Sequence, residues 1–170
     1  MKIIEALKKI KENKQKINDL HERISRNCAN NSHETTLYGE DTQSKIKEWL
    51  QSCNDLAQQN VHLLCNIQKT NLQTNVTIEL GGKNVTKSIA EWVWRRREYA
   101  KIDEITWSKL SDRGLREGVL KNSLGMDTEV RIVRHFDPSE RDEKIDIYRS
   151  EPHKIDGALE VVNAVTDLVE

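Results

Sequence analysis

The chain has 170 residues, a formal net charge of −1, 36% hydrophobic residues and 32% charged residues. A charge so close to zero argues against a protein that binds nucleic acid or acidic membranes over its whole surface. The mean hydropathy of −0.75 and the two prolines are typical of long helices with narrow apolar stripes. We therefore expect a mainly α protein with a minor β part, built as a single helical domain over residues 1–170.

The cysteines and the lengths of the apolar runs indicate in which cellular compartment the protein is expected. Cys28, Cys53 and Cys65 are odd in number and lack C-x-x-C spacing, which favours a reducing environment over a disulfide framework or a zinc site. No apolar run is long enough for a signal peptide or a membrane span. We expect a cytoplasmic protein, or one assembled into a virion, with no membrane partner.

The first expected element is an amphipathic helix that carries a coiled-coil seam. Isoleucines recur every seven residues along it, and the alternate seam positions hold Ala6, Asn13 and Leu20. Spacing of three and four is typical of helices that pack against one another, and one polar seam residue such as Asn13 can fix their register. We expect the partner or oligomer interface on this seam, at Ile3, Ile10, Asn13, Ile17, Leu20 and Ile24.

A second long helix follows a polar loop, with Asp41 or Thr42 as its cap. Residues 1–72 are thus predicted to form an antiparallel helical hairpin. A second apolar row widens the stripe of this helix: Leu50, Ala57 and Leu64. Because a wide stripe needs more than one neighbour, we expect the second helix to lie centrally in a bundle.

Alternation around a Gly-Gly pair predicts a β-hairpin over residues 76–86. Ser88 and Glu91 form a capping box that opens a third helix over 87–112. A strand over 128–136 is expected to join the hairpin in one small three-stranded sheet.

Residues 138–169 keep helical spacing after Asp137 and Pro138, a favourable helix start. Pro152 lies inside this run and is expected to kink the helix or divide it in two.

The segment WVWRRRE, Trp92 to Glu98, has the residue types of a nucleic-acid contact. Arginines beside aromatic rings can neutralise phosphates and stack on bases, so Trp92, Trp94, Arg95, Arg96 and Arg97 are candidate anion or nucleic-acid contacts. They can equally stack on one another and pair with neighbouring acids. Strong duplex binding typically needs about six to ten phosphate contacts, and this face does not supply them, so we favour a structural use.

Other polar residues give no pattern for catalysis. None of the five histidines has the spacing of a metal pair, and the glycines, lysine and serine of GGKNVTKS are not in phosphate-loop order. We expect no catalytic residues, no cofactor and no metal; an enzyme with an intersubunit site would need a pocket with convergent titratable groups. Near the end of the second helix, Asn66, Thr70 and Asn71 are expected to form a structural junction.

Short motifs along most of the chain resemble the uncharacterised bacterial proteins known as septicolysins. The start M-K-x-x-E-A-L matches Met1 to Leu7, and the middle motif is approximated by Ile67, Thr70, Asn71 and the run 95–97. The strand entry is similar to residues 128–131. The closing pattern corresponds to Asp156, Asn163, Thr166 and Leu168, although Ala164 stands where the family usually has tryptophan. The resemblance implies a helical fold and brings no established catalytic residues.

These observations predict a non-enzymatic structural or interaction protein that forms a homo-oligomer through its helical seams and binds another protein. A multi-copy component of a bacteriophage virion or of a bacterial assembly fits this architecture. The alternative is a nucleic-acid-binding protein that uses the Trp92–Arg97 face.

Overall fold

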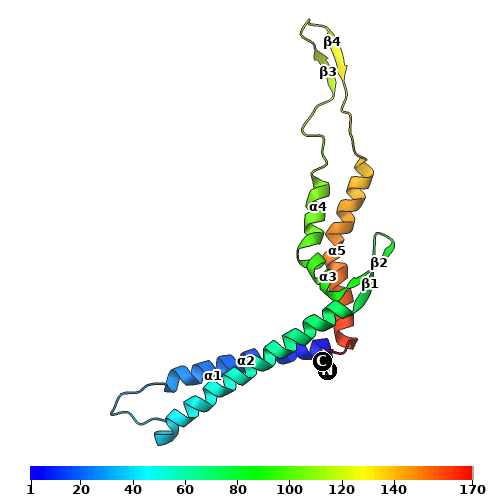
Figure 1. Cartoon of the computed structure of the whole chain (residues 1–170). Helices are drawn as coiled ribbons and strands as arrows, with labels where there is room; N and C mark the ends of the chain where they lie inside the picture. Colours follow the sequence, from blue (N-terminus) through cyan, green and yellow to red (C-terminus); the bar gives the residue numbers. More distant parts are fainter. Residues whose placement is uncertain (170) are drawn as a thin grey trace. The chain divides into compact units, whose positions relative to one another are not determined.

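The computed structural model describes residues 1–169 and is mainly α-helical with a minor β part, as the sequence predicts (Figure 1). The chain forms two compact units. The first contains Met1–Thr74 with the C-terminal residues from Glu160, and the second contains Asn75–Leu159. The single helical domain expected over residues 1–170 stays a prediction.

The first unit is a helical hairpin of α1 (Ile3–Asn27) and α2 (Thr42–Gln73), with a short 3-10 helix η1 (Gly39–Asp41) before α2. The two helices lie side by side and run antiparallel (Figure 1). Their core contains the buried side chains of Ala6, Ile10 and Ile67, against which Leu63 and Leu168 pack.

The C-terminal tail closes this unit against the start of α1. The amide of Ile3 donates to the carbonyl of Thr166 at 3.0 Å, and the amide of Leu168 donates to the carbonyl of Met1 at 2.8 Å. Lys2 adds an ion pair with Asp167 at 2.6 Å. The last helix therefore ends at Val165 and not at residue 169, because the tail pairs with the N-terminus.

The second unit begins with a β-hairpin of β1 (Asn75–Leu80) and β2 (Lys83–Ser88). Gly81 and Gly82 form its turn with φ angles of 55° and 74°, a conformation that favours glycine at both positions. Ser88 then caps α3 (Ile89–Trp94): its hydroxyl accepts from the Glu91 amide at 3.2 Å, while the Glu91 carboxylate accepts from the Ser88 amide at 2.8 Å.

The expected helix over 87–112 is interrupted and shorter. A π-helical turn η2 (Arg95–Tyr99) connects α3 to α4 (Ala100–Ser108). Trp92 anchors α3 to the hairpin because its fully buried indole donates to the carbonyl of Val76 at 2.9 Å.

The expected three-stranded sheet does not form. The strand predicted over 128–136 is a shorter β4 (Asp127–Val130), which pairs with β3 (Gly118–Lys121) in a second two-stranded antiparallel sheet. The sequence gives no alternation signal for β3, because all four of its residues are exposed. β4 ends early as a strand because its partner strand has only four residues.

The last helix, α5 (Pro138–Val165), continues through Pro152 without being divided in two. A proline inside a helix costs about 3 kcal/mol, so packing on both sides must hold this one together. Glu151, Ile155 and Leu159 are buried around it, and these contacts outweigh the local preference of Pro152.

Candidate interaction surfaces

Half of the seam residues predicted to form an oligomer interface are buried within this chain. Ile3, Ile10 and Asn13 are buried, and the remaining seam residues, Ile17, Leu20 and Ile24, are half-buried. They face α2 of the same hairpin, since the sequence pattern of a seam does not say whether its partner belongs to the same chain. Ile3, Ile10 and Asn13 are therefore buried within the chain, while a role of the half-buried seam residues in an oligomer interface stays a prediction.

A different row on α2 is exposed. Leu50, Val61 and Leu64 have exposed fractions of 54%, 60% and 45%, and Ala57 between them is also exposed. At 100° per residue these four side chains fall within about 60° of one another, on a face separate from the one that packs on α1. The expectation that α2 lies centrally in a bundle is wrong for the described chain, because α2 packs on α1 and its second apolar row, which also includes Val61, is exposed.

This row lies in a segment almost without charge. From Trp49 to Gln68 the sequence contains one acidic residue, Asp55, and no lysine or arginine, although 32% of the whole chain is charged. The side chains beside the row include the amides Asn54 and Gln58 and the thiol Cys65. Depletion of charge around exposed apolar residues distinguishes the centre of an interface from ordinary surface.

Asn13 meets Asn60 in the middle of the hairpin. The Asn13 amide donates to the Asn60 side-chain oxygen at 3.0 Å, and both residues are buried. The Asn13 side-chain oxygen has no partner in the described chain. Because any slip of α1 along α2 would bury both amides without a partner, this pair selects one register.

The predicted junction residues lie near the end of α2. Thr70 is fully buried; its hydroxyl donates to the carbonyl of Asn66 at 2.7 Å and accepts from the amide of Val169 at 2.9 Å. Asn66 is also buried, and the side-chain oxygen of Asn71 is buried without a hydrogen-bond partner in the described residues. Thr70 thus ties the C-terminal tail, and not the incoming hairpin, to α2.

Arg95 is the centre of an ion-pair network in the second unit. Its guanidinium donates from Nε and Nη2 to the two oxygens of Glu151, each at 2.7 Å, and from Nη1 to Asp103 at 2.6 Å. It also stacks over the ring of Tyr148 at 5.7 Å. Hydrogen bonds to Glu151, and secondarily to Asp103, raise the pKa of Arg95, so the guanidinium stays charged at every accessible pH.

The rest of the WVWRRRE segment is also engaged. Arg96 pairs with Asp156, and Arg97 stacks over the ring of Trp94 at 6.0 Å. Trp92 is fully buried and is not accessible to a base. Glu151, which pairs with Arg95, and Asp156, which pairs with Arg96, lie 56 and 60 residues away in sequence, so no local signal could have identified these two partners. Nucleic-acid binding by this segment stays an untested alternative, which salt-dependent binding of a single-stranded oligonucleotide would detect.

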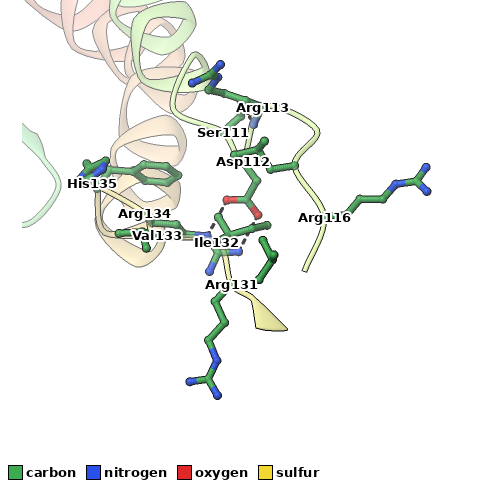
Figure 2. A pocket seen from close by; sticks show the side chains of 12 residues that line it. Ser111, Asp112, Arg113, Arg116, Arg131, Ile132, Val133, Arg134 and His135 are labelled. Atoms are coloured by element: carbon green, nitrogen blue, oxygen red, sulfur yellow. Dashed lines mark hydrogen bonds and ion pairs between the residues drawn. The ribbon is translucent and has the colours of Figure 1, made fainter. Parts of the chain in front are cut away.

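A hollow of about 510 Å³ lies at the base of the β3–β4 hairpin, lined by residues 111–116 and 130–136 (Figure 2). Asp112 and Arg134 face one another there in a bidentate pair, with distances of 2.7 and 2.6 Å. The hydrogen bonds from Arg134 lower the pKa of Asp112. Arg113, Arg116 and Arg131 point outward (Figure 2). None of the lining residues is buried, so the hollow is open to solvent.

Residues 1–169 hold no group of three or more His, Cys, Asp or Glu side chains that could bind a metal ion. Cys53 is half-buried, while Cys28 and Cys65 are exposed. In the part of the chain that the structure describes, no helix is both long and apolar enough to span a membrane.

The fold and these surfaces define a mainly helical protein with an exposed apolar row on α2 and two separate two-stranded β-hairpins. The chain belongs to a family of unknown function, DUF6847, which matches residues 11–168. No curated protein matches the chain. A crystal structure titled as a functionally unknown conserved protein from Corynebacterium diphtheriae is similar over 99% of both chains, with 19% sequence identity and a TM-score of 0.57. That similarity concerns the fold alone.

Proposed function

We propose that this protein is a non-enzymatic interaction protein that self-associates through the outer row of α2, defined as Leu50, Ala57, Val61 and Leu64. The observation that carries the proposal is an exposed apolar row in a 20-residue segment, Trp49 to Gln68, with one charged residue. An ordinary solvent-facing helix surface in so charged a chain would carry lysine and glutamate, as the exposed face of α1 does.

A second copy of the chain is the occupant that this row fits best. Two copies of a nearly uncharged face meet without like-charge repulsion, and a two-fold axis lets the same row supply both sides of the contact. A partner with a strongly charged surface would gain no ion pairs here and would lose hydration. From Leu50 to Leu64 the row extends about 21 Å along the helix, which is long enough for several turns of helix packing.

The size of the row sets the expected affinity. Leu50, Val61 and Leu64 are each about half exposed, so burying the remainder contributes roughly 1 kcal/mol per side chain, or about 6 kcal/mol for both copies. Association costs at least about 4 kcal/mol. The row alone therefore supports a weak dimer whose population depends on concentration, and amide pairs beside it add to this.

Sedimentation equilibrium over about 1 to 500 µM protein tests the proposal. The wild type is expected to shift from the 19.7 kDa monomer towards twice that mass as concentration rises. Val61→Glu places a charge in the contact and should weaken the association, so that the average mass stays below that of the wild type at every concentration. Val161→Glu is the matched control, because Val161 is a helical valine of similar exposure, 65%, outside the row. A monomeric wild type at every concentration, or equal behaviour of the two variants, would refute the proposal.

A multi-copy structural role in a bacterial or virion assembly would rest on the same self-association. Such a protein acts through contacts between copies and with another protein, whereas the septicolysin resemblance rests on short sequence motifs and implies a helical fold. The resemblance supplies no catalytic residue to test, so the assembly state is the property to measure first.

A further inference from the structure

The β3–β4 hairpin has two open edges. Seven of its eight strand residues are exposed, and no other strand pairs with either edge in residues 1–169. A lone two-stranded hairpin is marginally stable in water, and open edges are templates for pairing with another chain.

The hairpin hydrogen bonds determine which backbone groups of β4 face outward. The amide of Asn122 donates to the carbonyl of Met126 at 2.9 Å, so residues 122 and 126 form a hydrogen-bonded pair. Such pairs alternate along an antiparallel ladder; therefore Thr128 and Val130 point their backbone groups towards β3, and Asp127 and Glu129 point theirs outward. The amide of Ile132 fits this alternation, because it points inward and donates to the Glu117 carboxylate at 3.0 Å.

The charges on β4 select one way of pairing this edge with a second copy. If two β4 strands pair antiparallel about a two-fold axis at Val130, Glu129 of each copy lies opposite Arg131 of the other. A shift of the axis to Glu129 or Arg131 would place like charges directly opposite each other. An axis at Thr128 would place Asp127 opposite Glu129, again with like charges.

The segment after β4 supports a longer strand than the hairpin uses. Ile132 and Val133 are β-branched residues that favour extended backbone, and they lie beyond the observed end of β4 at Val130. In the Val130-centred register, Thr128 lies opposite Ile132 of the second copy and Asp127 opposite Val133.

From this geometry we infer that β4 is a second self-association site, at which two copies join their hairpins into one four-stranded antiparallel sheet centred on Val130. The inference deepens the proposed self-association and rests on it for the identity of the partner, a second copy. It uses a different element in the other compact unit. A chain with two such two-fold contacts can join more than two copies.

Disulfide trapping tests the register. Across the axis, Val130 would face Val130 in a non-hydrogen-bonded pair with a Cα separation of about 4.5 Å, which a disulfide can bridge. In a full-length chain with Cys28, Cys53 and Cys65 replaced by serine, Val130→Cys should give a covalent dimer under mild oxidation. Val133→Cys is the control, since two copies of residue 133 would lie about 20 Å apart.

Charge exchange separates this site from the α2 row. In the Val130→Cys chain, Glu129→Lys should reduce the rate of cross-linking at least tenfold, and the double variant Glu129→Arg with Arg131→Glu should restore it. All rates are measured with Val61→Glu present, so that failure of the α2 contact does not remove the β4 signal. Equal rates at positions 130 and 133, or no recovery in the double variant, would overturn the inference.

Discussion

Replacing Arg95 with methionine should destabilise the protein by about 3 kcal/mol, at the low end of the cost of breaking a buried ion pair. The Glu151 side chain is 2% exposed and receives two of its hydrogen bonds from Arg95. Without the guanidinium it becomes a buried carboxylate without a charge partner. The low end applies because Arg95 itself is 22% exposed, so some water can enter.

Urea unfolding followed by circular dichroism at pH 7 measures this cost. Asp103→Asn removes the other partner of Arg95 and should cost about 1 kcal/mol or less, because Asp103 is 38% exposed and its charge is partly screened. The double variant Arg95→Met with Glu151→Leu removes both buried charges and should recover most of the lost stability. If Arg95→Met costs no more than Asp103→Asn, the reasoning that Arg95 is committed to Glu151 fails.

Three further predictions concern single contacts. Hydrogen bonds from Arg134 lower the pKa of Asp112 in the folded state. This pair therefore stabilises the protein above about pH 4, and the stabilisation disappears as the pH falls through the lowered pKa. The difference in urea midpoint between the wild type and Asp112→Asn should accordingly vanish in acid. Asn13→Leu alone should cost about 1–3 kcal/mol by stranding the buried Asn60 amide, whereas the double change to leucine should raise the melting temperature. Thr70→Val should speed hydrogen exchange at the backbone amide of Val169, which donates to the Thr70 hydroxyl, and should lower the free energy of unfolding by about 1 kcal/mol.

The sequence predicted those parts of the fold that depend on local signals. The capping box of Ser88 and Glu91, the Gly81–Gly82 turn and the helical spacing of α1 and α2 each combine residue type with short spacing, so they were found correctly. Hydrophobic periodicity also identified which side chains of α1 form a seam. It could not identify the partner of that seam, because the same spacing serves a helix of the same chain and a helix of another.

The incorrect predictions concern elements whose structure depends on residues far away in the sequence. Pro152 disrupts a helix by local rules, yet α5 continues because Glu151 beside it is held by Arg95 and Ile155 is buried. Strand β3 carries no inward-facing apolar row, so no sequence pattern marked it and β4 was paired with the wrong hairpin.

Charge is distributed differently over the WVWRRRE segment and over the outer row of α2, the two candidate contact surfaces. The segment from α3 to α4 is joined to α5 by ion pairs, among them Arg95–Glu151 and Glu104–Arg149. In this highly charged chain, ion pairs hold helices together as apolar contacts do in other proteins. Charged residues on a helix can therefore reflect internal packing as well as ligand binding. A helix face without charged residues is then unusual in this chain. On α2 that face is also exposed and apolar, so the place where charge is missing indicates a contact better than the place where it is most concentrated.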